Sequence, residues 1–143
     1  MKIKNHLKSS GTINVEELLN FCAEELDIPE DVSLILIQNE KLLESLSKDV
    51  EFEALLQNPI EKQFVLFTRD KTISQYIICH EMIHMDQYCR GDLKTSDDFR
   101  EVTWKGEKFD NDVPYEDREW EKEAFSKQNK LWKKFKQTIK NKK

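Results

Sequence analysis

The sequence has no long apolar run and contains little glycine or proline. Its 143 residues include three glycines and three prolines, while charged residues make up 36% of the chain. A membrane helix needs about 20 consecutive apolar residues, and no segment approaches that length. Residues 1–6 also lack the apolar stretch of a secretory signal peptide. We therefore expect a helix-rich cytoplasmic protein that forms one domain over residues 1–143.

Cysteine is scarce as well, and three cysteines do not form an even disulfide framework. Cys22 falls on the apolar face of an expected helix, so we interpret it as a small core residue. Cys79 and Cys89 flank the histidine motif of residues 80–84, at helical positions that turn away from its two histidines. Zinc ligation by cysteine is therefore not favoured.

Only three histidines are present, but two of them lie four residues apart in the segment His80-Glu81-Met82-Ile83-His84. Residues i and i+4 share one face of a helix, so both imidazoles are able to reach one point. Zn²⁺ binds imidazole nitrogens in a tetrahedral shell. Glu81 lies about 100° around the helix from His80, close enough to meet a water molecule beside the metal. This HExxH arrangement indicates a zinc hydrolase with Glu81 as general base.

The segment around the motif has the features of a buried helix. Residues 72–75 (Thr-Ile-Ser-Gln) form a capping box that predicts a helix start near Ile73. Gly91 predicts its end just after Arg90. Apolar residues between these two points cover much of the helix circumference, which is typical of a buried helix rather than an exposed charged one.

A third protein ligand is expected on a later helix, because hydrolytic zinc sites keep three protein ligands and one open position. Glu119, Glu121 and Glu123 occupy alternate positions there, so they cannot all face one metal. We interpret Glu121 as the ligand, because Ala124 one turn later permits close packing and because Glu121 borders an inward stripe. Glu123 is the alternative and Glu119 the third choice. The stripe comprises Trp120, Ala124, Gln128, Leu131, Phe135 and Ile139.

The motif and the later glutamate, in its Glu-x-x-Ala context, resemble the gluzincin branch of the zincin metallopeptidases. Residues 103–106 (Thr-Trp-Lys-Gly), followed from Pro114 by Pro-Tyr-x-x-Arg-x-Trp-Glu-x-Glu-Ala, are similar to small zincin-like peptidases of bacteria and their phages. The nearest comparisons are SprT-like, ImmA/IrrE-type and minimal gluzincin domains, over about residues 51–128. No histidine follows His84, which excludes a third histidine ligand, and Gln87 stands where metzincins have glycine.

The resemblance implies an α+β fold: a small zincin-like domain whose short mixed sheet packs on the HExxH helix and on a C-terminal ligand helix. It implies one Zn²⁺ per chain, bound by His80, His84 and Glu121, and hydrolysis of peptide bonds. It also implies that the strand over residues 64–67 borders the cleft and binds an extended substrate by strand addition.

Further site residues are less clearly indicated. Tyr115 and Arg118 are candidates to stabilise the oxyanion of the reaction, although Tyr115 also suits a core edge and Arg118 a surface ion pair. Tyr88 shares a helix face with Glu81, and we interpret it as a packing residue first and a cleft residue second. The outer nitrogens of both imidazoles need hydrogen-bond acceptors. Asp or Glu side chains are expected in this role, and the sequence does not identify which.

The rest of the chain divides into short elements. Asn14 with Glu17 predicts a helix cap, and Ile13 with Leu18 a hydrophobic staple. Residues 32–37 predict a buried strand and residues 40–47 a short helix. Two strands, 52–56 and 63–67, are expected to join around Asn58-Pro59, and strands 100–104 and 107–109 to form a hairpin around Lys105-Gly106. We divide the domain into an N-terminal region (1–50), a catalytic core (51–128) and a basic helix end (127–143).

Charge is unevenly distributed along the chain. The net charge is −5, yet residues 127–143 contain eight lysines and no acidic residue. Lysines near the end of a helix interact favourably with its dipole and keep it soluble, which is the interpretation we prefer. Binding of nucleic acid is the other interpretation, because Trp132 and Phe135 alternate with the lysines.

The leading hypothesis is therefore a zinc metallopeptidase that acts on a peptide or protein. The alternative is a zincin-fold regulatory or binding module whose metal is structural or sensing, with nucleic-acid association through the basic tail as a further option. Glu81 favours the enzyme, since a structural metal site has no use for a general base. The sequence indicates neither the substrate nor the oligomeric state.

Overall fold

The fold is α+β, as expected from the sequence. The computed structural model describes residues 1–7, 14–46, 54–69, 73–96, 100–110 and 112–141. Two compact units make up the chain, Met1–Ile78 and Cys79–Lys143, and their boundary falls within one helix. The division into a single domain with three regions stays a prediction.

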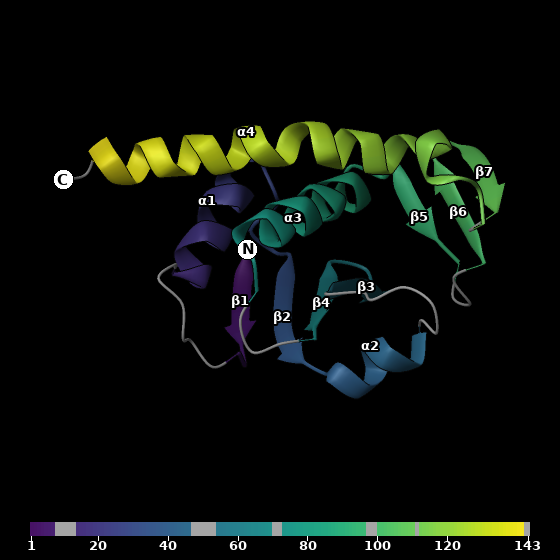
Figure 1. Cartoon of the computed structure of the whole chain (residues 1–143), viewed down its shortest axis with the longest axis horizontal. Coiled ribbons are helices and arrows are strands. Elements are labelled where there is room, and N and C mark those ends of the chain that lie inside the picture. Colours follow the sequence, from purple (N-terminus) through teal and green to yellow (C-terminus); the bar gives the residue numbers. More distant parts are fainter. Residues whose placement is uncertain (8–13, 47–53, 70–72, 97–99, 111, 142–143) are drawn as a thin grey trace. The chain divides into compact units, whose positions relative to one another are not determined.

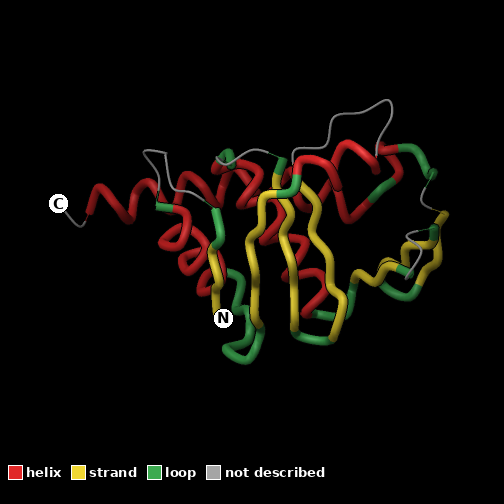
Figure 2. Tube along the Cα trace, turned by 90° about the horizontal axis from the view of Figure 1, so that it is seen from below, coloured by secondary structure: helices red, strands yellow, loops and turns green. Residues whose placement is uncertain are grey.

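The first unit contains a mixed four-stranded sheet with the order β1-β2-β4-β3 (Figure 2). Strands β1 (Lys2–Asn5), β2 (Ser33–Gln38) and β4 (Gln63–Thr68) are parallel, while β3 (Ala54–Ile60) runs antiparallel to β4. The inward side chains of the two central strands are fully buried, among them Leu34, Leu36 and Leu66. Strand β1 was not expected, because four residues with two lysines carry little strand signal of their own.

The two helices of the first unit agree with the sequence patterns. Helix α1 (Val15–Glu25) is capped by Asn14, whose side chain accepts a hydrogen bond of 3.1 Å from the Glu17 amide. This bond satisfies one of the free amides at a helix start. Helix α2 (Glu40–Leu46) corresponds to the short helix expected over residues 40–47. The staple predicted from Ile13 lies outside the described residues.

The turn between β3 and β4 differs from the expected one. Asn58 and Pro59 belong to β3, and the chain turns at residues 61–62, where Lys62 has a φ of 66°. A register irregularity separates Gln57 from Ile60 in this edge strand. An edge strand tolerates proline there, because the missing amide has no ladder partner to lose. The Asn58 side-chain amide donates to the carbonyls of Ile60 and Gln63, which holds the irregular segment in place.

Strand β4 is an interior strand, so the expectation that residues 64–67 bind a substrate by strand addition is wrong. Its residues pair with β2 on one side and with β3 on the other. Both rows of backbone hydrogen-bonding groups are therefore already used, and none remains for another chain. Within the described part of this sheet, the edge strands are β1 and β3.

Helix α3 (Gln75–Cys89) carries the histidine motif and has well-defined ends. It begins two residues later than expected, with the Ser74 hydroxyl accepting from the Tyr76 amide, while Thr72 lies outside the described residues. At its end, Gly91 adopts a φ of 80°. The Asp92 amide donates to the Gln87 carbonyl and the Gly91 amide to the Tyr88 carbonyl. This pair of bonds is a Schellman motif, which confirms the predicted stop.

The second unit adds a three-stranded antiparallel sheet, β5 (Leu93–Thr95), β6 (Glu101–Trp104) and β7 (Glu107–Asp110). The predicted hairpin is confirmed, with positive φ angles at Lys105 and Gly106 in its turn. Strand β5 has three residues and was not expected. Leu93, Val102 and Trp104 of this sheet pack with Trp120 in a small apolar cluster, with Tyr88, Phe109 and Val113 at its margin.

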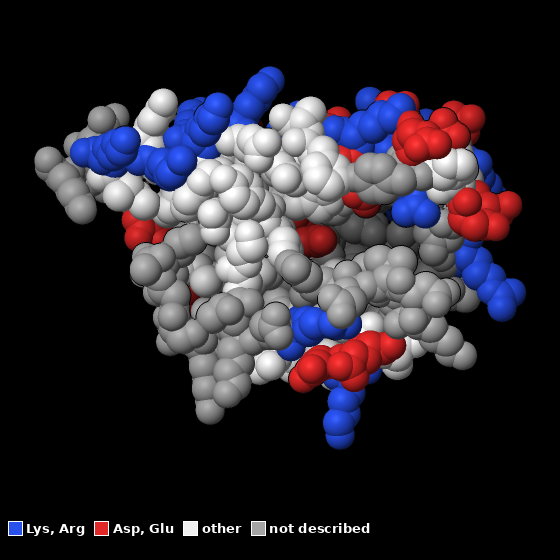
Figure 3. All heavy atoms as spheres, in the orientation of Figure 1, with Lys and Arg blue, Asp and Glu red and all other residues white. Residues whose placement is uncertain are grey.

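Helix α4 (Glu119–Asn141) follows a single 3₁₀ turn, η1 (Tyr115–Asp117), and runs alongside the part of α3 that belongs to the second unit (Figure 1). The expected stripe faces inward: Trp120, Ala124, Leu131 and Phe135 are buried, and Gln128 and Ile139 are partly buried. Lysines gather towards the C-terminal end of this helix and acidic side chains at its start (Figure 3). No helix in the described ranges is long and apolar enough to cross a membrane.

The Gly91 cap yields a test of how α3 is terminated. A Cβ atom added to Gly91 would meet nothing within 4 Å, so Gly91→Ala adds strain through its φ alone. We expect this substitution to lower the free energy of unfolding by about 1 kcal/mol in a urea titration. Gly91→Asn is the matched control and should cost less, because asparagine tolerates the left-handed conformation. An alanine variant as stable as the native chain would contradict the cap.

Candidate metal centre

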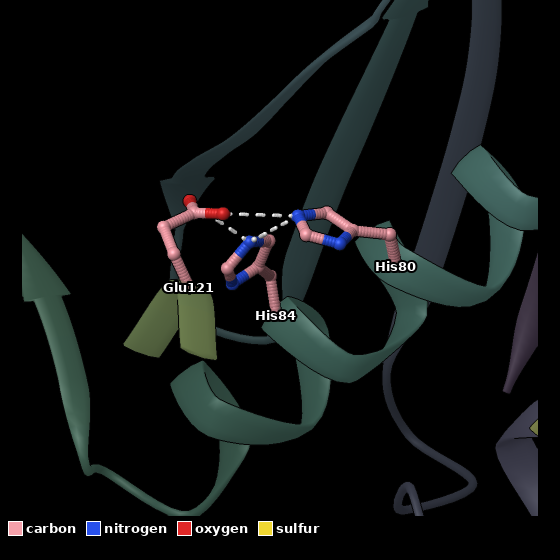
Figure 4. Close-up of side chains that lie close together, drawn as sticks. All are labelled: His80, His84 and Glu121. Atoms are coloured by element: carbon pink, nitrogen blue, oxygen red, sulfur yellow. Dashed lines mark hydrogen bonds and ion pairs between the residues drawn. The ribbon is translucent and has the colours of Figure 1, made fainter. Parts of the chain in front are cut away.

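Helices α3 and α4 bring His80, His84 and Glu121 together (Figure 4). The two histidines lie one turn apart on α3, and Glu121 lies in the first turn of α4. One nitrogen from each imidazole and one oxygen from the carboxylate all lie within 4.8 Å of one another. All three residues belong to the second unit, so the cluster is contained in one compact body.

The spacing of the donor atoms suits a tetrahedral metal. The Nε2 atoms of His80 and His84 are 3.1 Å apart. The two oxygens of Glu121 lie 3.1 Å from His80 Nε2 and 3.2 Å from His84 Nε2. Ligands at 2.0–2.1 Å from a tetrahedral Zn²⁺ are separated by roughly 3.3 to 3.4 Å. The two imidazole nitrogens are thus within a few tenths of an ångström of tetrahedral spacing, and each of them lies at a similar distance from a different oxygen of the Glu121 carboxylate.

Two glutamine side chains orient the imidazoles from behind. His80 Nδ1 lies 2.7 Å from Oε1 of Gln128, and His84 Nδ1 lies 2.7 Å from Oε1 of Gln87. An amide oxygen only accepts hydrogen bonds, so each Nδ1 donates its proton. When the imidazoles are neutral, each Nε2 is then left with a lone pair on the side of the common point, as metal ligation requires.

Sequence reasoning expected Asp or Glu side chains in this role and missed both glutamines. Gln128 was placed in the inward stripe of α4 without a role, and Gln87 served only to exclude the metzincin pattern. The available signal was Gln87 itself, a polar side chain three residues after His84 in a helix that the sequence indicates is buried. It is fully buried, and buried amides require partners. Gln128 gave no such signal, because its partner depends on which face of α4 meets α3.

The structure also places the two other candidate glutamates. Glu123 accepts hydrogen bonds from Arg90 at 2.6 Å and from the Gln87 side chain at 3.2 Å. Burial works to raise the pKa of Glu123, but these two donors lower it below its usual range. Glu119 is exposed and pairs with Lys122 at 3.3 Å. Of the three glutamates, Glu121 is the one whose oxygens lie with the imidazole nitrogens.

Glu81 is partly buried and directly precedes the buried turn of α3 that leads to His84. Burial raises the pKa of its carboxyl group, and the Glu121 carboxylate raises it further, whereas the two imidazoles oppose the shift. A carboxyl group with a raised pKa, next to a pair of imidazoles, has the properties of a general base.

Four other side chains surround the cluster or lie near it in sequence. Tyr88 packs at the margin of the small apolar cluster, its hydroxyl lies 3.5 Å from that of Thr95, and burial raises its pKa. Arg118 donates from Nε to the Val113 carbonyl at 3.0 Å, which holds the segment before α4. The side chain of Tyr115 lies outside the described residues. Phe125, 49% exposed, places its ring edge-on to His80 at 4.9 Å.

The pKa shifts of His84 and Glu121 show that the three donors require a positive charge among them. Burial on its own would lower the pKa of His84, but the hydrogen bond to Glu121 and the nearby carboxylates raise it to about 9. Burial likewise works to raise the pKa of Glu121, whereas both imidazoles lower it far below its usual range. A proton on His84 thus occupies the position of positive charge that a metal ion would take.

Comparison with protein-family models, with curated proteins and with solved structures finds no match for this chain. The case for the site therefore depends on its own geometry.

The raised pKa of His84 predicts a pH dependence for the metal-free protein. Its folded-state pKa of about 9 exceeds the ordinary value of 6.5, so between these values the folded chain holds a proton that the unfolded chain has lost. The stabilisation is complete below pH 6.5 and is lost as the pH rises towards 9, by at most about 1.4 kcal/mol per pH unit. Urea titrations across this range should show the decline, and His84→Asn should flatten it. An identical slope in both proteins would refute this assignment.

Proposed function

We propose that this protein is a zinc-dependent metallopeptidase of the zincin type. The observation that carries the proposal is the convergence of His80, His84 and Glu121 from two helices, with Nε2 and carboxylate oxygens 3.1 to 3.2 Å apart. Two imidazoles, one carboxylate and an open position form the ligand set of hydrolytic zinc sites. The donor chemistry therefore fits one Zn²⁺ per chain.

Zinc held by His80, His84 and Glu121 would supply a Lewis acid that polarises a carbonyl and makes a water molecule more acidic. The chain supplies the rest of the chemistry. Glu81 accepts a proton from the attacking water as the water oxygen bonds to the scissile carbonyl carbon. When the carbon–nitrogen bond breaks, Glu81 delivers that proton to the leaving amine. Gln87 and Gln128 hold the imidazoles with their Nε2 lone pairs in place.

The presence of Glu81 is what favours an enzyme over a binding or sensing module. A structural zinc site is usually closed by four protein ligands, whereas the described cluster offers three, with a carboxyl group of raised pKa beside it. The substrate proposed is a peptide or protein. A cytoplasmic location is proposed with it, on the basis of the three free cysteines.

Metal content tests the ligand set directly. Protein purified without added metal should contain about one zinc per chain by elemental analysis, and His84→Ala and Glu121→Ala should lose it. Glu123→Ala is the matched control, since Glu123 accepts from Arg90 and Gln87. After all three variants are incubated with saturating zinc and unbound metal is removed, Glu123→Ala should contain zinc, whereas His84→Ala and Glu121→Ala should not. Retention of zinc by Glu121→Ala would show that another residue is the third ligand. A folded native chain that binds no zinc would refute the proposal.

Catalysis is tested separately with Glu81→Gln, which removes the base and preserves side-chain volume. This variant should bind zinc like the native chain but hydrolyse an unfolded protein substrate such as casein about 10²- to 10⁴-fold more slowly. Release of new amino termini is the readout. A native chain that binds zinc, cleaves nothing and is unaffected by Glu81→Gln would favour the regulatory or binding module instead.

A further inference from the structure

We propose that Gln87 is a positioning residue that fixes two of the metal ligands at once, His84 and Glu121. This inference rests on the metal-binding part of the proposed function. Gln87 is fully buried in the last turns of α3. Its oxygen contacts His84 Nδ1, and its nitrogen contacts the first turn of α4 at the Trp120 carbonyl and the Glu123 carboxylate. One side chain therefore touches both helices that carry ligands.

The contacts of the Gln87 amide leave it only one orientation. The Trp120 carbonyl at 3.0 Å and the Glu123 carboxylate at 3.2 Å are both acceptors. The amide group facing them has to be the NH₂, since an oxygen there would be repelled by both. The amide oxygen then faces His84 at 2.7 Å, and His84 carries its proton on Nδ1. The α4 contacts of Gln87 thus set the tautomer that leaves His84 Nε2 free for a metal ion.

The same nitrogen also restrains Glu121. Its acceptor is the carbonyl of Trp120, which is the residue immediately before Glu121. Trp120 is itself anchored, because its indole ring is buried in the small apolar cluster with Leu93, Val102 and Trp104. Gln87 therefore holds the backbone of the turn from which the Glu121 carboxylate reaches the two imidazoles.

Glu123 supports this arrangement from the outer side. The Glu123 carboxylate accepts from Gln87 and is held by Arg90 at 2.6 Å. Arg90 is in turn held by Asp86 at 3.3 Å and by Asp92 at 3.6 Å. These charged groups lie in and just after the last turn of α3. Glu123 therefore acts on the candidate metal centre by its hydrogen bond with Gln87. Its effect on metal affinity should accordingly depend on the presence of Gln87.

Gln128 is a natural control for Gln87. Its Oε1 lies 2.7 Å from Nδ1 of the other histidine, His80, which is the equivalent contact. Gln128 itself lies about two helical turns after Glu121 on α4. Substituting either glutamine by methionine, which is similar in length, removes one imidazole contact. Only the change at position 87 also removes the bonds to Trp120 and Glu123.

The experiment measures metal affinity and metal geometry rather than hydrolysis. Zn²⁺ affinity is obtained by competition with a chelator, and the visible absorption of the Co²⁺-substituted protein reports the coordination geometry. We expect Gln87→Met to weaken Zn²⁺ binding about 10- to 100-fold and to alter the Co²⁺ spectrum. Glu123→Ala should weaken binding in the native chain and in Gln128→Met, but should add no further loss in Gln87→Met.

Conservative variants separate positioning from a general loss of structure. Glu123→Gln keeps an oxygen that accepts from Gln87, so it should restore most of the affinity lost in Glu123→Ala. Gln87→Glu keeps the acceptor for His84 but sets a carboxylate against the Trp120 carbonyl and Glu123, so its Co²⁺ spectrum should differ from the native one. Thermal unfolding followed by circular dichroism identifies folded variants, and the Glu123 pair decides the matter if Gln87→Met does not fold.

The inference is overturned if folded Gln87→Met binds Zn²⁺ as tightly as the native chain, or if Glu123→Ala causes the same loss with and without Gln87. The outcomes also separate it from the proposed function. A chain that binds metal with the expected variant pattern yet hydrolyses nothing sinks the peptidase and leaves the role of Gln87 intact. An active peptidase whose metal affinity does not change in Gln87→Met overturns the role of Gln87 and leaves the proposed function intact. A native chain that binds neither Zn²⁺ nor Co²⁺ overturns both.

Discussion

The second unit depends on one electrostatic constraint: two imidazole nitrogens and a carboxylate are held 3.1 to 3.2 Å apart, largely away from solvent. Electron-rich atoms at this distance repel one another unless positive charge lies among them. In the metal-free chain a proton on His84 supplies it, which is why the pKa of that imidazole rises while the pKa of the Glu121 carboxyl falls. A zinc ion would supply this positive charge more fully. The three donors are kept in place by the two glutamine amides, the cap of α3 and the ion pairs of Arg90.

The outer shell uses neutral amides where carboxylates are also common. Gln87 and Gln128 each accept one proton from an imidazole without adding negative charge. Glu121 is then the charged member of the three candidate donors, and the Glu123 carboxylate, which accepts from Gln87, is paired with Arg90. Such a site would leave a bound cation with most of its positive charge, which favours polarising a substrate over merely holding a structural ion.

The features that the sequence predicted are those encoded by local periodicity. Four-residue spacing places His80 and His84 on one face of any helix, and Asn14 and Gly91 mark helix ends through chemistry within a few residues. Glu121 was chosen from its neighbours on α4, and the structure places it beside the histidines. Long-range features were missed for a physical reason. The interior position of β4 is a property of strand order, and the strands β1 and β5 exist only because partners hydrogen-bond to them.

The turn at Lys62 illustrates the same limit at short range. Asn58-Pro59 is a common turn sequence, but an edge strand accommodates proline, so the strand continued to Ile60 and a lysine took the left-handed conformation. The choice of Gln128 as partner of His80 is similar, because it depends on how α4 is rotated about its axis. One residue of rotation would have presented a different side chain to that imidazole.

The boundary between the two compact units has a consequence for how robust the metal centre is. It falls between Ile78 and Cys79, within the first turns of α3 and ahead of both histidines. The three candidate donors, Glu81, both glutamines and the Glu123–Arg90 pair therefore all belong to one body. The distances that define the centre are internal coordinates of that body, so any placement of the first unit leaves them unchanged. The spacing of the candidate metal donors is therefore a property of the second unit alone.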